Sequence, residues 1–557
     1  MKFKELAEYL QKLESTPSRI EMTRILAQLF KESSPEDAQL IAYLSAGKLG
    51  PPYANPDMGV ADKMTLRALG DKALGLFKKL GDLGLVAQEM SIGKGTLSIK
   101  EVHEKLLALA TASGTGSQEK KQQLIGELLS NLDPLSAKYV VRIILGKMRI
   151  GFSDMTVLDS LSWMAKGDKS LRSAIERMYN VRADLGEIAK RFRAKLKSEK
   201  IAPQIGTPIL MARAERATSA GQIWERNGRC AAEYKLDGLR IQAHITADKI
   251  WLFSRGLEDV SSMYPDVVAG LRKHLKKSAI VEGEMIALGK DGKFLPFQET
   301  MQRKRKYDIE SMSGKIPLTI YLFDALVVAG ENLMDQPNEK RRQVLEQLVK
   351  REKDTGTVRL MERTIVESVA DIEQFFKVAL KDGTEGIIAK RLQGPYQAGS
   401  RDFNWIKYKK SYDQSALADT IDAVVMGYDV GQGKRAGFGI GDFLIGVYDA
   451  KADRYLTVAK IGTGLTDEEW RRMKREVDAI KIPGKPSNYE VKKEMRVDVW
   501  AKPKIVVEVQ ADEITKSPMH SSSLALRFPR LTSWREKQPE DATSLTELLR
   551  LFDLQKK

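Results

Sequence analysis

The sequence predicts three domains of different class: an all-α domain over residues 1–207, a mixed α/β (α+β) domain over 208–411 and an all-β domain over 412–557. Three observations lead to this prediction. Apolar residues recur at helical spacing in the first two hundred residues, alternating strand patterns follow, and short strands between glycine-rich turns fill the last part. A chain of 557 residues is also too long for a single core.

Helix signals dominate the first domain. The first helix has one apolar face, made by Phe3, Leu6, Leu10 and Leu13. The run Ser33-Ser34-Pro35-Glu36 predicts the start of a later helix, because serine caps a helix and proline suits its first turn. The glycine- and serine-rich residues 112–117 predict a loop.

The second domain begins after a linker at Gly206-Thr207-Pro208 and opens with strand signals. Alternation from Leu239 to Ile245 predicts a strand, and Lys235 lies at the turn that enters it. Gly238 in this turn suits a close backbone approach or a positive φ. Further strands are predicted before Phe253-Ser254-Arg255-Gly256, over 281–285 and from Leu318 to Phe323.

Short strands are predicted throughout the third domain, over 423–428, 443–448, 455–461 and 505–509. Glycine-rich turns such as 437–441 separate them. About five short strands in a segment of this length suit a small closed barrel of the OB type.

Lys235 is interpreted as a covalent nucleophile. An ordinary lysine has a pKa of about 10.4, so it needs nearby cations or a metal to become a useful neutral amine at neutral pH. The sequence offers such cations if its motifs fold together: Arg240, Arg255, Lys407 and Lys409. The alternative interpretation, from the Lys-x-Asp-Gly run alone, is a surface lysine beside a turn.

Several further clusters follow Lys235 in a fixed order, and they carry a resemblance to a known family. They are Phe253 to Gly256, Val281-Glu282-Gly283-Glu284-Met285, Tyr321 to Asp324, Glu385 to Lys390 and Trp405 to Lys409. Their order, spacing and content resemble the covalent nucleotidyltransferase superfamily of ATP-dependent DNA ligases and messenger RNA capping enzymes. A P-loop ATPase is disfavoured, because the sequence has no Gly-x-x-x-x-Gly-Lys-Ser/Thr run.

The resemblance implies that Lys235 attacks the α-phosphate of ATP, expels pyrophosphate and holds AMP. It implies that Glu233 recognises adenine and that Phe323 stacks on the base. It also implies roles for several charged residues: sugar and phosphate contacts by Arg240, Arg255 and Arg401, Mg²⁺ (or Mn²⁺) ligation by Glu284 and Glu385, and charge neutralisation at the α-phosphate by Lys407 and Lys409.

Taken singly, these residues have plainer interpretations. Phe323 suits a core position within its apolar run. Glu284 suits a solvated strand position, and Lys407 with Lys409 and Lys410 suits a charged surface. Only the ordered set favours a site.

The run from Tyr139 to Phe152 resembles the signature of the helical DNA-binding domain of archaeal and eukaryotic replicative ligases. Lys147 and Arg149 would contact phosphate, and backbone amides beside Gly146 and Gly151 would approach the duplex. The alternative is a core helix that ends in a basic turn. Capping enzymes and most small RNA ligases lack such a domain.

The last motif departs from the family pattern. Arg527-Phe528-Pro529-Arg530 matches, but the Arg-x-Asp-Lys element that should follow is replaced by Trp534-Arg535-Glu536-Lys537, one residue short and without the aspartate. In the family this element orients pyrophosphate during self-adenylation. The resemblance assigns that role to Arg535 and Lys537, and the departure leaves it open whether self-adenylation is fully supported.

Composition agrees with a polyanionic partner. The net charge is +16 and the pI about 9.4, which favours nucleic acid, although a hot or salty environment would also select basic proteins. The one cysteine, Cys230, excludes an intrachain disulfide and a four-cysteine zinc site. No apolar run is long enough to span a membrane and no secretory signal is recognised, so an intracellular protein is expected.

The predicted function is that of an ATP-dependent DNA ligase, which seals nicks in duplex DNA for replication, repair, recombination and cell division. The alternatives are an RNA ligase or capping-type enzyme and, from another class, a DNA-binding scaffold without catalysis. A monomer is expected, and a sliding clamp is a partner by family analogy only. Use of ADP, GTP or NAD, the choice between Mg²⁺ and Mn²⁺, and the growth temperature are left open.

Overall fold

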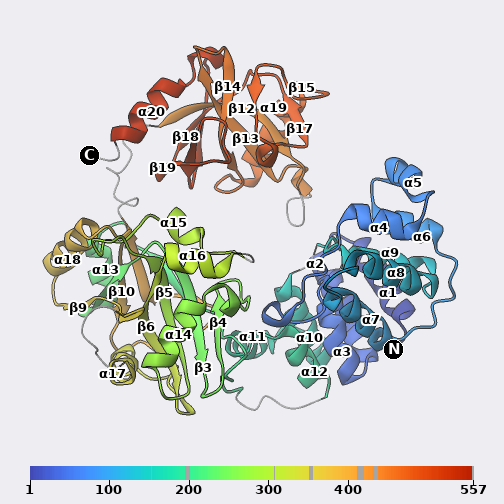
Figure 1. The fold of residues 1–557 in the computed structure, drawn as a ribbon, viewed down its shortest axis with the longest axis horizontal. Coiled ribbons are helices and arrows are strands. Elements are labelled where there is room, and N and C mark those ends of the chain that lie inside the picture. Colours follow the sequence, from blue (N-terminus) through green and yellow to red (C-terminus); the bar gives the residue numbers. More distant parts are fainter. Residues whose placement is uncertain are drawn as a thin grey trace. The chain divides into compact units, whose positions relative to one another are not determined.

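The computed structural model describes residues 1–151, 153–194, 201–305, 308–349, 356–409, 420–431 and 437–554. The chain divides into two compact units, Met1–Lys409 and Lys410–Lys557 (Figure 1). The predicted boundary after Ser411 lies outside the described residues, as does Phe152.

The first part of the first unit is helical, as predicted (Figure 1). Its helices are α1 (Phe3–Glu14), α2 (Arg19–Glu32), α3 (Pro35–Leu44), α4 (Asp62–Leu69), α5 (Ala73–Leu80), α6 (Leu83–Met90), α7 (Ile99–Thr111), α8 (Ser117–Ser130), α9 (Pro134–Ile144), α10 (Asp154–Lys166), α11 (Arg172–Val181) and α12 (Leu185–Arg193).

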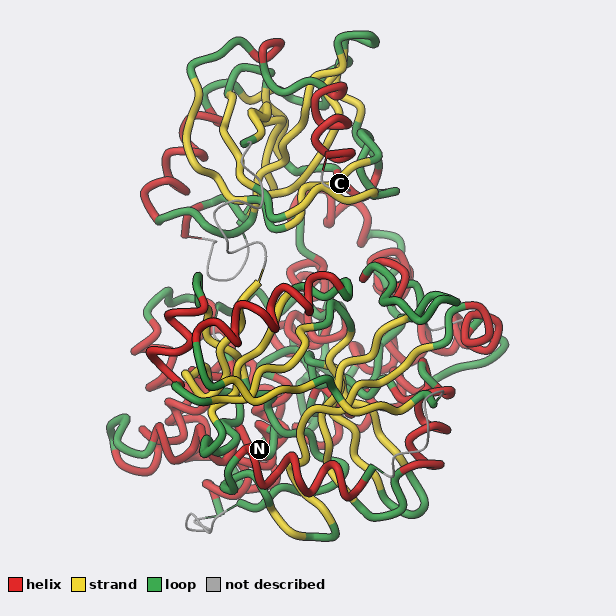
Figure 2. Tube along the Cα trace, turned by 90° about the vertical axis from the view of Figure 1, so that its left-hand side faces the viewer, coloured by secondary structure: helices red, strands yellow, loops and turns green. Residues whose placement is uncertain are grey.

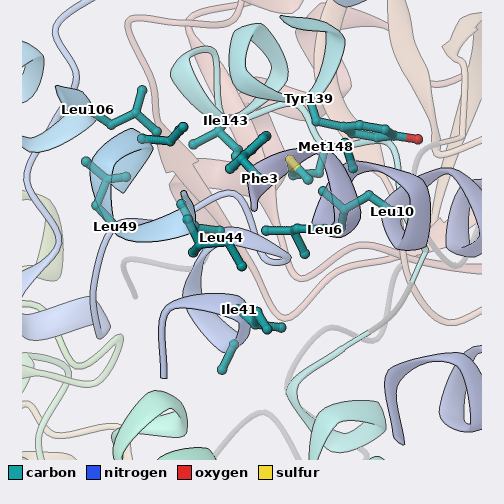
Figure 3. Close-up of a cluster of buried hydrophobic side chains, with 14 of the residues drawn as sticks. Phe3, Leu6, Leu10, Ile41, Leu44, Leu49, Leu106, Tyr139, Ile143 and Met148 are labelled. Atoms are coloured by element: carbon teal, nitrogen blue, oxygen red, sulfur yellow. The ribbon is translucent and has the colours of Figure 1, made fainter. Parts of the chain in front are cut away.

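Sequence signals account for these helices. The Ser34 hydroxyl accepts a hydrogen bond from the Asp37 amide, and Pro35 is the first residue of α3, so the predicted helix start is confirmed. Figure 3 shows the core that the helices share, in which Phe3, Leu6 and Leu10 of α1 lie near side chains of α9. The predicted loop over 112–117 is confirmed up to Gly116, after which α8 begins.

Among the described residues, the rest of the first unit contains two sheets with helices beside them. One has the order β1-β11-β10-β2-β9, and the other has the order β4-β3-β5-β6-β7, with β8 paired to β6. The strands are β1 (Arg213–Arg216), β2 (Cys230–Lys235), β3 (Leu239–Ile245), β4 (Ile250–Ser254), β5 (Ala279–Ala287), β6 (Leu318–Val328), β7 (Glu331–Asn332), β8 (Val358–Leu360), β9 (Arg363–Val366), β10 (Gly386–Arg391) and β11 (Arg401–Lys409).

Helices pack along the two sheets, as Figure 2 shows. They are α13 (Ala220–Asn227), α14 (Pro265–His274), α15 (Phe297–Met301), α16 (Ile309–Lys315), α17 (Asn338–Leu348) and α18 (Val369–Lys381). The predicted mixture of helices and strands in this region is confirmed.

Strand β3 has the predicted alternation, and both of its faces are buried. The polar side chains on one face of β3 accept hydrogen bonds from the segment that connects the helices to the sheets. Gln242 accepts a hydrogen bond from the amide of Ile209, and the His244 ring accepts one from the amide of Gly206. These bonds satisfy two polar side chains that burial would otherwise destabilise.

The second unit is rich in strands, as predicted. Its main sheet has the order β15-β17-β12-β13-β14-β16, with β18 paired to β12 and to β21, and β19 pairs with β20. The strands are β12 (Ile421–Asp429), β13 (Asp442–Asp449), β14 (Arg454–Ile461), β15 (Lys481–Ile482), β16 (Tyr489–Glu490), β17 (Val499–Ala501), β18 (Val506–Gln510), β19 (Glu513–Lys516), β20 (Leu524–Arg527) and β21 (Arg530–Arg535). In the described part of this unit, the strands are accompanied by two α-helices, α19 (Asp467–Asp478) and α20 (Leu545–Leu554).

None of the described helices is both long and apolar enough to cross a bilayer.

Candidate active site

Strand register gathers the predicted residues on one face of the first sheet. Glu233 is paired with Ile388, which is paired with Lys407, and Lys235 is paired with Gly386, which is paired with Lys409. Side chains two residues apart on a strand point to the same side. Strands β2, β10 and β11 therefore present the following side chains on a common face: Glu233, Lys235, Ile388, Lys390, Trp405, Lys407 and Lys409.

Lys235 is the last residue of β2, directly before the turn into β3. Its ammonium forms an ion pair with the carboxylate of Glu385, and the same carboxylate lies 2.8 Å from the ammonium of Lys409. The Glu385 amide also donates a 2.9 Å hydrogen bond to the Lys235 carbonyl. The nucleophile predicted from the sequence thus has a carboxylate as its direct partner, with a second lysine on the other side of that carboxylate.

The turn after Lys235 brings the second sheet close. A Cβ on Gly238 would lie 2.4 Å from the carbonyl oxygen of Met285 and 3.0 Å from Cγ of Glu284. The predicted close backbone approach at Gly238 is therefore confirmed. A larger residue here would push away the strand that carries Glu284.

A pocket lies beside Lys235, and both sheets contribute to it. Its lining residues are Glu233, Tyr234, Lys235, Leu236, Arg240, Glu284, Phe323, Met361, Ile388, Lys390 and Trp405. Five of the residues predicted from the sequence are among them: Glu233, Lys235, Arg240, Glu284 and Phe323.

One end of the pocket is aromatic. The rings of Phe323 and Trp405 meet edge to face, with centroids 5.9 Å apart. The Lys390 ammonium lies 4.5 Å from the centroid of the Phe323 ring and 2.6 Å from the Glu233 carboxylate. Oε1 of Glu233 is buried and has no hydrogen-bond partner among the described residues. The pocket thus contains an aromatic platform beside an unsatisfied acceptor.

Arg240 lies beside this aromatic end but is already engaged. Its guanidinium donates hydrogen bonds of 2.7 Å to Glu282 and 2.6 Å to the carbonyl of Ala212. The guanidinium carbon also lies 5.5 Å from the centroid of the Phe323 ring. The predicted contact of Arg240 with sugar or phosphate therefore has to come from the remaining edge of the guanidinium.

The two carboxyl groups nearest Lys235 have opposite pKa shifts. Burial raises the pKa of Glu284 to about 7, although Lys235 and Arg240 act in the other direction. Burial also disfavours ionisation of Glu385, but its ion pairs with Lys235 and Lys409 outweigh this effect and bring its pKa to about 2. The two carboxyl groups beside Lys235 therefore differ in how readily they ionise, and Glu284 binds a proton more readily than Glu385.

Lys407 stands in a cationic neighbourhood. Burial lowers its pKa, and so do the positive charges of Lys409, Arg401, Lys235 and Arg255. Arg255 follows β4, and Arg401 begins β11; both side chains are exposed. The structure therefore gathers around Lys407 two of the three arginines that the resemblance assigned to the sugar and phosphates, Arg255 and Arg401.

Glu284 and Glu385, the predicted metal ligands, both lie close to Lys235. Across the described ranges, no group of three or more His, Cys, Asp and Glu side chains is placed to hold a metal ion. Mg²⁺ usually takes only one or two carboxylates and completes its shell with water and substrate phosphates. Glu284 and Glu385 interact electrostatically beside Lys235, so they fit a site of this kind.

Comparison with known proteins agrees with this geometry. Family models match three stretches: "DNA ligase N terminus" over 2–162, "ATP dependent DNA ligase domain" over 211–409 and "ATP dependent DNA ligase C terminal region" over 436–538. A "Probable DNA ligase" of Dictyoglomus turgidum is 43% identical over 581 residues, covering 100% of this chain and 98% of the relative. The chain belongs to the ATP-dependent DNA ligase family. As a member, this ligase is an enzyme with ATP as its substrate.

Other relatives agree. "DNA ligase 2" of Thermofilum pendens is 40% identical to this ligase, covering 99% of this chain and 97% of the relative. The solved structure "Pmar-Lig_Pre" superposes with a TM-score of 0.54 and 17% identity, covering 95% of this chain and 99% of that one. At this identity the similarity shows a shared fold alone.

The predicted DNA-contacting residues of the ligase lie in its helical part. Lys147 and Arg149 are exposed, and each forms an ion pair, Lys147 with Asp62 at 3.1 Å and Arg149 with Asp82 at 2.9 Å. The amides of Gly146 and Lys147 donate to carbonyls at the end of α9. Those two amides are therefore not available to phosphate, which corrects the expectation for the backbone beside Gly146.

The predicted pyrophosphate-orienting residues lie in the second unit. Arg535 ends β21 and Lys537 follows it. Both pair with the carboxylate of Asp422, at 3.2 Å and 2.6 Å respectively.

Three side chains of the site received no role from the sequence: Lys390, Trp405 and Glu282. Lys390 and Trp405 lie within recognised motifs. Lys390 is two residues from Ile388 and Trp405 is two residues from Lys407, and this spacing predicts that each pair points to the same side of its strand. Their position beside Glu233 depends on strands β2, β10 and β11 being neighbours, which local spacing does not reveal. Glu282 also lies within a recognised motif, 281–285, but its contact with the site depends on its long-range hydrogen bond to Arg240.

Proposed function

We propose that the ligase seals nicks in duplex DNA through a lysyl-AMP intermediate on Lys235. In the first step the neutral Nζ of Lys235 forms a bond to the α-phosphorus of ATP, and the bond from that phosphorus to pyrophosphate breaks. In the second step an oxygen of the 5′-phosphate at the nick bonds to the phosphorus of AMP, and the bond from that phosphorus to Nζ of Lys235 breaks. Finally the 3′-hydroxyl attacks that phosphate and AMP leaves, which closes the backbone.

The observation that carries this proposal is the pocket beside Lys235. A lysine at its edge, an aromatic end and an unsatisfied buried acceptor occur together in it. The acceptor Oε1 of Glu233 suits the exocyclic amino group of adenine, whereas guanine has a carbonyl oxygen at that ring position. The Phe323 ring offers its face or edge to the base. These features favour ATP over GTP.

The phosphates would lie on the cationic side of the site. Lys407 and Lys409 neutralise charge that builds on the α-phosphate, and Arg255, Arg401 and Arg240 approach the sugar and phosphates. Burial lowers the pKa of Lys407, and the neighbouring positive charges lower it further in the free enzyme. Bound phosphates relieve that repulsion, so nucleotide binding and charge neutralisation favour each other.

Glu284 and Glu385 would hold Mg²⁺, or Mn²⁺ in its place. When bound, the metal supplies positive charge that stabilises the phosphate oxygens during transfer. In the free enzyme Glu385 is occupied by Lys235 and Lys409. We infer that its release from Lys235 accompanies ATP binding.

The wider assignments are also proposals. The boundaries between the three domains lie near residues 207 and 411. The ligase works inside the cell as a monomer in replication, repair and recombination. Lys147 and Arg149 exchange their carboxylate partners for DNA phosphates. Arg535 and Lys537 orient pyrophosphate in the first step. A sliding clamp remains a partner by family analogy alone.

The test compares the ligase with its Lys235→Ala variant and, as a matched control, Lys249→Ala. Lys249 is another lysine of the same unit and lies over the ring of Trp251, outside the pocket. With ATP and Mg²⁺, the parent and the control should gain the mass of one AMP and seal a nicked DNA duplex. Lys235→Ala should do neither.

Three results would overturn parts of this assignment. An adduct on Lys235→Ala would place the nucleophile elsewhere. An adduct with ATP but sealing of nicked RNA alone would point to an RNA ligase, whereas a preference for GTP would point to capping-type chemistry.

A further inference from the structure

The shortened motif at 534–537 lacks the aspartate of the family pattern, but the structure brings a carboxylate to it from elsewhere. Asp422 belongs to β12, more than a hundred residues earlier in the chain. Its Oδ1 lies 3.2 Å from Nε of Arg535, and its Oδ2 lies 2.6 Å from Nζ of Lys537. Each carboxylate oxygen of Asp422 thus forms an ion pair with one cation of the motif.

We infer that Asp422 is a positioning residue for Arg535 and Lys537. Its carboxylate fixes the positions of these two cations, which orient pyrophosphate. This inference rests on the proposed role of Arg535 and Lys537 in self-adenylation. Asp422 does not touch the reacting atoms in this account. It acts through the two cations.

The backbone of Asp422 is held firmly. Its amide donates a 3.0 Å hydrogen bond to the hydroxyl of Thr543, and its carbonyl accepts a 2.9 Å bond from the Thr543 amide. Its side chain is only 11% exposed. A carboxylate fixed in this way can impose one position on two long side chains, which would otherwise lose considerable rotamer freedom when they bind an anion.

A second acidic residue completes the arrangement on one side. Glu508 of β18 lies between the strands of Asp422 and Arg535 and is paired in register with Asp422 and Ser533. Its carboxylate accepts hydrogen bonds from Thr420, Thr532 and Ser533 and lies 3.7 Å from the Arg535 guanidinium. Glu508 is therefore largely committed to hydroxyl groups, and Asp422 is the carboxylate that bridges both cations.

The shared Asp422 carboxylate also reduces the electrostatic repulsion between the two cations. Arg535 and Lys537 repel each other, and a carboxylate between them removes much of this repulsion in the free enzyme. Both cations are 42% exposed, so each retains donors for a second anion. The pair is thus held together without being withdrawn from a phosphate ligand.

The experiment separates the chemical steps. Self-adenylation is measured as single-turnover formation of the AMP adduct from ATP. Its reversal is measured as loss of a preformed adduct at increasing pyrophosphate concentration. Sealing is measured on a nicked duplex that already carries AMP on its 5′-phosphate, which bypasses the first step. Asp422→Asn keeps the size of the side chain and removes its charge.

Asp422→Asn should slow self-adenylation by about 10- to 100-fold and raise the pyrophosphate concentration needed for reversal by a similar factor. Sealing of the pre-adenylated nick should stay within about two-fold. Asp422→Glu, which retains the charge, should recover part of the loss. Glu490→Gln is the matched control, because Glu490 forms an exposed ion pair with Arg454 in the same unit.

Three outcomes would overturn the inference. One is self-adenylation by Asp422→Asn at the parental rate. Another is an equal loss in all three measurements, which would show a merely structural role. The third is a further loss of self-adenylation rate when Asp422→Asn is added to the double variant Arg535→Ala/Lys537→Ala. We expect no further loss, and a further loss would show that Asp422 does not act through the two cations.

Failure of the underlying proposal has a different signature. If Arg535→Ala and Lys537→Ala each form the adduct at the parental rate and respond normally to pyrophosphate, the two cations do not orient pyrophosphate. If the parent forms no adduct, the assignment of Lys235 fails. Neither signature depends on Asp422→Asn.

Discussion

Glu233 and Lys390 form a 2.6 Å ion pair in which neither side chain is more than 2% exposed. The ammonium also lies 4.4 Å from the centroid of the Trp405 ring. Burial lowers the pKa of Lys390, and the Glu233 carboxylate opposes this effect. Each charge is therefore tolerated in the pocket because the other is present, and Oε1 of Glu233 is left without a hydrogen-bond partner among the described residues.

Removing one member of this pair should destabilise the ligase. Lys390→Met leaves the Glu233 carboxylate buried and unpaired, which costs about 3–5 kcal/mol in such pairs. The double variant Glu233→Gln/Lys390→Met should lose less than the sum of the two single losses. Thermal and urea unfolding of the four proteins measure both effects. Additive losses would show that the pair is not coupled.

Stability should depend on pH through Glu284. Burial raises its pKa from 4.5 to about 7, so the folded state binds this proton more tightly than the unfolded state. Its contribution to stability is fully present below pH 4.5 and is lost as the pH rises through about 7. Glu284→Gln should therefore become more stable relative to the parent, by roughly 1–3 kcal/mol between about pH 5 and pH 8.

The measurement is urea unfolding of both proteins across this pH range, without metal or nucleotide. Glu331→Gln serves as the control because Glu331 is exposed on β7. A difference between Glu284→Gln and the parent that stays constant with pH would contradict the raised pKa.

Glu14 should stabilise the helical part. Its carboxylate accepts hydrogen bonds from Tyr139 at 2.7 Å and pairs with Lys138 at 2.8 Å and Arg142 at 2.9 Å, which joins α1 to α9. Burial opposes ionisation, but these three partners together lower the pKa of Glu14. Glu14→Gln should cost about 1–3 kcal/mol at neutral pH, because buried Lys138 loses its carboxylate partner and buried Arg142 keeps only its ion pair with Asp82.

The sign of its pH dependence is opposite to that of Glu284. A lowered carboxyl pKa contributes stability above the unfolded value of 4.5 and loses it as the pH falls through the folded value. The difference between Glu14→Gln and the parent should therefore shrink in acid. Glu104→Gln is the comparison, since Glu104 forms an exposed pair with Lys100. Equal losses from the two variants would count against the role of Glu14.

DNA binding should depend on Lys147 and Arg149. Replacing either by alanine should weaken binding to a nicked duplex at any sequence and reduce the slope of log K against log salt by about 0.9 per lost phosphate contact. Fluorescence anisotropy over a salt series measures both quantities. Lys100→Ala is the control, and an unchanged slope in Lys147→Ala and Arg149→Ala would remove these residues from the DNA interface.

Local patterns were sufficient to predict several elements. Apolar spacing from Phe3 to Leu13 predicted α1, the serine and proline at 34 and 35 predicted the start of α3, and alternation predicted β3. These features depend on short stretches of chain, whose periodicity matches a helix or a strand directly. The order of the motifs around Lys235 likewise indicated the family, because that order is a property of the chain and needs no knowledge of its folding.

By itself, the sequence determined the class of each region, the family and the identity of the charged residues. Only the tertiary structure decided which charges meet. Glu233 meets Lys390 because β10 lies beside β2 in a particular register, and Asp422 meets Arg535 and Lys537 across a large separation in the chain. Such pairings, and the burial that shifts the pKa of Glu284, depend on long-range strand register and desolvation, which local spacing does not encode.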